Sequence, residues 1–273
     1  MAFRPPRFSH VHAARVVGAS AITLSPGSAD ADFPVDNLID DRAGTLFKWS
    51  ASQASPEIRV DLGASFDTGI DRLIIPSNHN IQTLSVEQAD DEPFTLNVET
   101  LHASDTSPTP GTLYDSGLFD TAVSSRRFIR VHMLTTALFF LPQIFLTKIV
   151  TLAVGPNLGD VIDEPRPNFS RQNQPSGQSP TVQLGPPQRF IEYAYDPPIT
   201  GADLTALEAL IANVGMSKPF FVDPASFSTP PETDEPALAM KFDTIPASRN
   251  SVVVPHSGVR AKTFKLELIE SVD

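Results

Sequence analysis

The sequence predicts a mainly β protein with an N-terminal β-sandwich, followed by a smaller α+β domain that contains one main helix. Prolines outnumber glycines, 26 to 14, which disfavours long helices and favours short strands joined by stiff loops. Most of the strand-like runs are rich in β-branched residues and are bounded by Asp, Gly, Ser or Pro. One segment, near residues 201–214, has apolar residues at clear helical spacing.

Length and a change in composition predict two domains. A chain of 273 residues exceeds the usual size of one domain, roughly 100–150 residues. We expect residues 1–13 to form an N-terminal extension, residues 14–155 the sandwich and residues 181–273 the second domain. Residues 156–180 are polar and rich in Pro, Gly, Asn and Gln, so this stretch is predicted to be a linker or a surface arm.

Alternating apolar and polar residues mark the strands of the first domain. The expected strands are residues 14–24, 57–62, 70–77, 94–102, 127–134 and 144–154. Alternation is clearest at Ile58, Val60 and Leu62, which are separated by Arg59 and Asp61. This pattern predicts a sheet with one buried and one exposed face.

The second domain is expected to combine one helix with several strands. The expected strands are residues 188–195, 218–222, 238–242, 251–254 and 263–269. Thr200 is the expected N-cap of the helix, Asp203 complements its dipole, and Gly215 ends it. The apolar face consists of Leu204, Leu207, Leu210, Ile211 and Val214. We expect this face to cover the sheet.

Composition excludes several functional classes. The absence of Cys removes disulfides, thiolate metal sites and cysteine nucleophiles. A net charge of -12 disfavours nucleic acid as a partner, because that affinity comes from Lys and Arg displacing counterions. The most apolar segment, residues 137–154, is interrupted by Pro142 and Lys148. It is also shorter than the roughly 20 apolar residues that a membrane-spanning helix needs. The sequence predicts a soluble protein without a membrane span.

No catalytic motif stands out. The chain has no GxSxG, P-loop, GxGxxG or HExxH pattern. A hydrolase of another type, with acids such as Asp61 or Asp91, stays open as an alternative, since the separation that paired acids need is spatial. We expect that the protein is not an enzyme and has no cofactor.

Trp49, Asn78, His79 and Asn80 are candidate ligand-binding residues. Trp49 precedes the polar stretch SASQASPE, so an exposed ring there could stack on a sugar. The alternative is that Trp49 closes one end of the sandwich core. Residues 78–80 follow the run RLIIPS and could line a ligand site, or they could form a hydrogen-bonded turn.

Asp36, Asp40 and Asp41 are weak candidates for a calcium site. Carboxylates and carbonyls are the ligands that Ca²⁺ prefers, but the spacing is not that of an EF-hand. The alternative is a solvated turn with local hydrogen bonds. His10 and His12 are two residues apart, and we expect both to be surface residues of the N-terminal extension.

Three segments resemble galactose-binding-like, discoidin-type jelly rolls. Residues 33–63 contain FPVDNLIDDRAGTLFKWSA and then IRVDLG, which resembles the opening of that fold. Residues 70–81, IDRLIIPSNHNI, resemble the strand and turn that follow in the versions carried by tailed-phage structural proteins. Residues 126–133, RRFIRVHM, together with a later apolar strand that ends at Gly155, are similar to the closing pair of strands.

A segment of the second domain extends the resemblance. Residues 193–224, YAYDPPITGADLTALEALIANVGMSKPFFVDP, resemble a segment found after such modules in phage tail and baseplate proteins. The resemblance implies a virion structural protein of the tail, synthesised in the host cytoplasm. It would assemble with other virion structural proteins as a homo-oligomer in a symmetric ring. The alternative function is that of a carbohydrate-binding module that attaches to a host glycan.

Overall fold

The computed structural model divides the chain into two compact units. One unit is residues 9–149, and the other is residues 150–272 together with residues 1–8. The structure describes residues 5–40, 45–53, 55–63, 70–120, 126–135, 139–156, 161–167, 169–171, 181–183, 187–215, 218–224, 237–244, 246–249 and 261–271.

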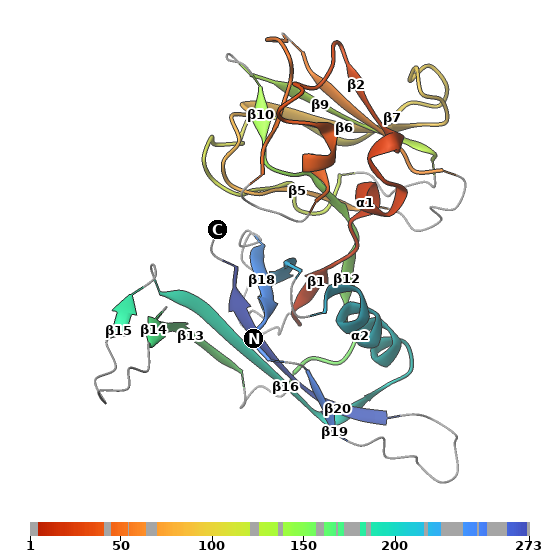
Figure 1. Ribbon diagram of the computed structural model, residues 1–273. Helices are drawn as coiled ribbons and strands as arrows, with labels where there is room; N and C mark the ends of the chain where they lie inside the picture. Colours follow the sequence, from red (N-terminus) through yellow and green to blue (C-terminus); the bar gives the residue numbers. More distant parts are fainter. Residues whose placement is uncertain are drawn as a thin grey trace. The chain divides into compact units, whose positions relative to one another are not determined.

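Residues 9–149 form a sandwich of two antiparallel sheets (Figure 1). The five-stranded sheet consists, in spatial order, of β2 (Ile22–Ser25), β4 (Glu57–Asp61), β9 (Phe128–Leu134), β6 (Thr83–Ala89) and β7 (Glu99–Asp105). The three-stranded sheet consists of β11 (Phe145–Thr147), β5 (Arg72–Ile75) and β8 (Tyr114–Asp115). The unit also contains the ribbon of β3 (Phe47–Lys48) with β10 (Phe140–Leu141), the helix α1 (Ala13–Val17) and two 3₁₀ turns, Ala19–Ala21 and Val35–Leu38.

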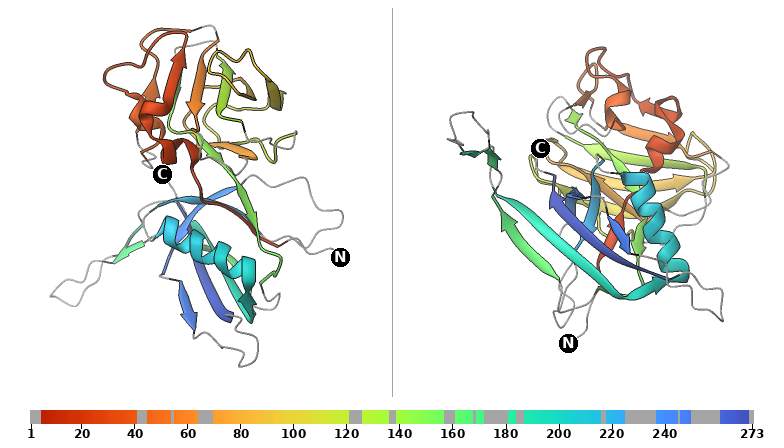
Figure 2. Two further views of the ribbon diagram at one scale, coloured as in Figure 1. Left: turned by 90° about the vertical axis from the view of Figure 1, so that its right-hand side faces the viewer. Right: turned by 60° about the horizontal axis from the view of Figure 1, so that its bottom comes forward.

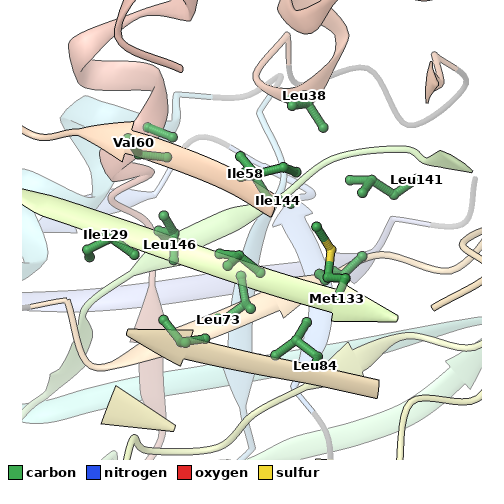
Figure 3. Packing of buried hydrophobic residues seen from close by; sticks show 14 of the residues in the cluster. Leu38, Ile58, Val60, Leu73, Leu84, Ile129, Met133, Leu141, Ile144 and Leu146 are labelled. Atoms are coloured by element: carbon green, nitrogen blue, oxygen red, sulfur yellow. The ribbon is translucent and has the colours of Figure 1, made fainter. Parts of the chain in front are cut away.

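Apolar side chains from both sheets fill the sandwich core (Figure 3). Ile58 and Val60 of β4 lie opposite Val131 and Ile129 of β9, and all four are buried. Leu73 of β5 packs into the same cluster from the other sheet. Burying a side chain of this size stabilises the fold by about 1.5–3 kcal/mol. The predicted alternation and the predicted sandwich are therefore confirmed.

Two predictions for the sandwich are wrong, and an inner strand was missed. Residues 14–17 form α1 and not a strand, because the buried ring of His12 caps the helix: its Nδ1 atom accepts a hydrogen bond from the Arg15 backbone N–H at 3.4 Å. The inner strand β6 was not predicted, although Leu84 and Val86 alternate with polar residues in it. Residues 94–98, expected at the start of a strand, belong to a loop that precedes β7.

The second unit is an eight-stranded sheet with one helix against it (Figure 2). The main path of the sheet is β12 (Ile149–Thr151), β1 (Arg7–Ser9), β17 (Phe220–Asp223), β18 (Leu238–Phe242), β20 (Ala261–Glu270), β16 (Gln188–Thr200) and β13 (Ile162–Arg166), and β19 (Ala247–Arg249) also pairs with β20. A separate pair, β14 (Phe169–Arg171) with β15 (Thr181–Gln183), lies beyond the end of the β13–β16 ribbon (Figures 1 and 2).

The helix α2 (Gly201–Val214) has the predicted bounds. Thr200 occupies the N-cap position without a side-chain hydrogen bond, and the chain leaves the helix at Gly215, which has a positive φ of 58°. Leu204, Leu207, Leu210 and Val214 are buried against the sheet. Ile211 is only partly buried. None of the described helices is long and apolar enough to cross a membrane.

The predicted domain boundaries need correction at both ends of the sandwich. Residues 1–13 are not an extension, because β1 is an inner strand of the second unit's sheet. The sandwich is thus inserted between β1 and β12. The expected strand 144–154 is split between β11 of the sandwich and β12 of the other sheet. The expected strand 251–254 lies outside the described residues.

The predicted linker, residues 156–180, belongs in part to the second unit. β13 pairs with β16 along its whole length, and β14 pairs with β15. β13 has a linker-like composition because it is an edge strand whose side chains are nearly all exposed, and edge strands tolerate Pro and charged residues.

Candidate functional site

Five connecting segments meet at one end of the sandwich. The last residue of β2 pairs with the first residue of β4, and the last residue of β9 pairs with the first residue of β6. In the other sheet, the last residue of β5 pairs with the first residue of β8. Antiparallel pairing therefore brings the loops after β2, β5, β7 and β9, and the loop before β4, to the same end.

The parts of these segments nearest the strand ends carry no charged side chain, although the loop after β2 continues into Asp30 and Asp32. These parts are residues 26–29, 50–53, 55–56, 76–82, 106–113 and 134–135, and we call them the neutral rim. None is Asp, Glu, Lys or Arg, although such residues make up 19% of the chain. The exposed polar side chains of the rim are those of Ser28, Ser50, Ser52, Ser55, Ser77, Asn78, Gln82, Thr106, Ser107, Thr109 and Thr112. The rim thus presents hydroxyl and amide groups.

Trp49 is part of the core beneath the rim. Its side chain is 0% exposed and lies edge-on between Phe47 and Phe139, with ring centroids 4.7 and 4.8 Å away. Its indole Nε1–H donates a hydrogen bond to the Pro26 carbonyl at 3.0 Å. The prediction that Trp49 stacks on a sugar is wrong, because no face of the ring is accessible. The alternative, that it closes one end of the core, is confirmed.

His79 and Asn80 hold the rim together from inside. The buried His79 ring accepts a hydrogen bond from the Ile81 N–H at Nδ1 (3.2 Å), and the His79 carbonyl accepts one from the Gly111 N–H (3.1 Å). Burial lowers the pKa of His79, so the ring is neutral at pH 7. Asn80 Oδ1 accepts a hydrogen bond from the Phe140 N–H at 3.0 Å. The alternative of a hydrogen-bonded turn is therefore the correct interpretation of these two residues.

Asn78 is the one candidate of the four whose side chain is exposed. Its backbone has a positive φ of 73°, a conformation that Asn tolerates better than most residues. The structure thus brings all four predicted residues to one end of the sandwich, where Trp49 and His79 are buried, Asn80 is half-buried and Asn78 is exposed. The exposed Ser and Thr residues of the rim were missed, because each one alone looks like an ordinary loop residue.

The calcium prediction concerns the later part of the loop after β2, beyond the residues of the neutral rim. Asp40 accepts hydrogen bonds from the Thr45 hydroxyl (2.9 and 3.0 Å) and the Gln143 amide (2.9 Å). Asp36 lies in the first turn of a 3₁₀ helix, and Asp41 lies outside the described residues. No three His, Asp or Glu side chains form a metal-binding group in the part of the chain that the structure describes. The calcium site stays a prediction.

The opposite end of the sandwich carries the acids that were considered for hydrolysis. Asp61 accepts two hydrogen bonds from Arg127 (2.6 and 2.7 Å), which hold the pKa of its carboxyl group below the usual value. Asp91 accepts hydrogen bonds within its own loop, from Thr95 and Leu96. Both carboxylates are engaged in contacts that stabilise the fold.

Comparisons with known proteins find likenesses to solved structures. No family model matches the chain, and no curated protein matches its sequence. Chitosan-binding module 1 of a chitosanase/glucanase from Paenibacillus sp. IK-5 is 18% identical with a TM-score of 0.40, over 50% of this chain and 98% of that chain. The family 32 carbohydrate-binding module of C. perfringens NanJ, in complex with galactose, is 16% identical with a TM-score of 0.38, over 52% of this chain and 99% of that chain.

An enzyme is also among the similar structures. A Ruminococcus gnavus GH29 fucosidase is 19% identical with a TM-score of 0.40, over 51% of this chain and 27% of that chain. Similarity at this level carries neither a ligand nor an activity over to this chain.

Proposed function

We propose that the sandwich is a non-catalytic carbohydrate-binding domain that binds an uncharged glycan at the neutral rim. The observation that carries this proposal is the absence of charged side chains from the residues of the neutral rim, in a chain whose net charge is -12. A sugar hydroxyl both donates and accepts hydrogen bonds, and the side chains of Ser, Thr, Asn and Gln also do both. When a neutral sugar docks there, no charged group of the protein or of the sugar has to lose its hydration water.

The rim is also stiff enough to bind at a low entropic cost. It contains five prolines, Pro26, Pro56, Pro76, Pro108 and Pro110, and proline restricts a loop before binding. The bond from Trp49 to Pro26 ties one loop to the core, and the bond between Gly111 and His79 ties two loops together. Acidic glycans are disfavoured, since the negative charge of the chain repels them.

A matched pair of variants tests the proposal on an array of neutral and acidic glycans. Asn78 and Asn97 both have a positive φ, so Gly replaces either without backbone strain. Asn78 is in the rim, whereas Asn97 lies at the other end of the sandwich. We expect the chain to bind neutral glycans, Asn78→Gly to weaken that binding about threefold to tenfold, as the loss of one hydrogen bond does, and Asn97→Gly to leave it unchanged.

Three outcomes would overturn glycan binding at the rim. They are an array without any bound glycan, binding restricted to acidic glycans, and equal affinities for the two variants. Unfolding of both variants in urea should be recorded alongside, so that a loss of fold is not taken for a loss of binding.

A second candidate function is that of a tail or baseplate subunit in a tailed-phage virion. It rests on the sequence resemblance and needs a contact with a neighbouring subunit, for which the β14–β15 pair beyond the end of the β13–β16 ribbon is a candidate (Figure 2), because an isolated two-stranded hairpin is only marginally stable in water. Packing against a neighbouring subunit would stabilise this pair. Mass photometry of the full chain should then show assemblies of one fixed copy number. A monomer at every concentration would contradict this function and leave glycan binding untouched.

A further inference from the structure

Residues 90–98 form a loop that is held in shape by its own side chains. Asp91 Oδ1 accepts hydrogen bonds from the backbone N–H groups of Thr95 (2.9 Å) and Leu96 (2.8 Å), and the Thr95 hydroxyl donates to Oδ2 at 2.5 Å. Asn97 donates to Asp90 at 2.6 Å. The bonds from Thr95 and Asn97 hold the pKa of Asp91 and Asp90 below the usual value, so this network stays intact at neutral pH.

Phe94 anchors the same loop to the sheet. Its side chain is buried and packs with Ala89 and Phe128, and the Arg130 guanidinium lies 4.5 Å from its ring centroid. Phe94 and Asn97 have positive φ values of 56° and 51°, which are uncommon outside glycine. The loop therefore has one preferred conformation.

Leu96 and Val98 of the same loop are exposed to solvent. They are 59% and 44% exposed, and they are two residues apart on the stiff loop. Single exposed aliphatic residues are common on protein surfaces. Two of them on a preorganised loop are different, because burying them in a partner costs little conformational entropy.

The surroundings of this aliphatic pair are acidic. The loop and the start of β7 contribute four carboxylates, those of Asp90, Asp91, Glu92 and Glu99. Arg59 forms an ion pair with Glu92, and Arg126 forms ion pairs with Asp90 and Glu99. The side chains of Asp90 and Glu92 remain about half exposed. A second copy of this chain would bring the same negative charge, so a partner of opposite charge fits better.

We propose that Leu96 and Val98 dock into an apolar pocket rimmed by Lys or Arg on a partner protein. The two aliphatic side chains supply the apolar anchor, and the carboxylates around them select a basic rim. This site lies at the opposite end of the sandwich from the neutral rim and does not depend on glycan binding.

A random-peptide library displayed on yeast and sorted on the full chain tests this site. We expect the enriched peptides to combine Lys or Arg with Leu, Ile or Phe, and to bind more weakly at high salt. The double variant Leu96→Ser, Val98→Ser should bind them at least about tenfold more weakly. Leu134→Ser is the control, because Leu134 is also exposed but belongs to the neutral rim. Glu92→Gln should weaken binding and reduce its dependence on salt.

The proposal is overturned if no peptide is enriched, if the enriched peptides lack basic residues, or if they bind the double variant as well as the unchanged chain. Leu96 and Val98 do not contribute to the core, so the double variant should retain the urea unfolding midpoint of the unchanged chain. A weaker affinity then reports on the docking surface.

Discussion

The two ends of the sandwich differ in how their loops are held. At the neutral rim, aromatic rings and buried hydrogen bonds from Trp49, His79 and Asn80 hold the loops from below, and the exposed side chains are uncharged. At the other end, ion pairs and carboxylates such as Asp61 and Asp91 hold the loops from the surface. One core thus supports two surfaces of different chemistry, one suited to a neutral ligand and one to a basic partner.

The largest effect is expected at the base of the neutral rim. Trp49→Ala should lower the free energy of unfolding by about 3–5 kcal/mol, because it empties a large buried site and leaves the Pro26 carbonyl without its donor. Trp49→Phe should cost less, since it retains most of the ring. Urea unfolding measures both. If both variants lost only a small and equal amount of unfolding free energy, the Trp49 ring would not be what holds the rim to the core.

A buried ion pair at the end of the sandwich opposite the neutral rim, which we call the charged end, should give the next largest effect. Arg72 is 1% exposed and binds Asp115 through two hydrogen bonds. Arg72→Ala should cost about 3 kcal/mol, because the Asp115 carboxylate is left buried without its cation. The double variant Arg72→Met, Asp115→Leu should lose less than Arg72→Ala, since neither charge remains. A larger loss in the double variant would contradict this account.

Acid should weaken the helix that precedes β2. Burial against Phe145, whose ring centroid is 4.7 Å away, lowers the pKa of His12 from 6.5 to about 3. The unfolded chain binds this proton below about pH 6.5 and the folded chain does not, so the free energy of unfolding falls by about 1.4 kcal/mol per pH unit as the pH drops toward 3. His12→Asn retains a cap acceptor and should show a shallower decline between about pH 6 and 4. If the free energy of unfolding fell equally with pH in His12→Asn and in the unchanged chain, the prediction would be contradicted.

The smallest effect is expected for an exposed ion pair. Arg127 binds Asp61 at the charged end, and its side chain is more than half exposed. Arg127→Ala should barely change the urea midpoint, because water and salt screen such pairs. A loss as large as that of Arg72→Ala would remove the distinction between buried and surface charges at this end.

Part of the candidate site could be predicted from local sequence. The runs that follow Trp49 and flank Asn78, residues 50–56 and 76–82, are mostly polar, and their lack of charge can be counted directly. Whether they share one surface depends on which strands pair, and the pairing partners of β4 and β9 are about 70 residues apart. The loop of residues 106–113 was missed for the same reason, since nothing local links it to His79.

The sequence by itself determined the mainly β class, the alternation of β4 and the bounds of α2, because periodicity and end signals are local properties of the chain. Only the tertiary structure decided that β1 joins the sheet of the second unit, that Trp49 is buried and that the loops divide into a neutral and a charged end. These outcomes depend on contacts between distant segments, such as the one that brings Phe139 against Trp49. Local composition does not encode such contacts, because the free energy that selects them comes from packing the whole core at once.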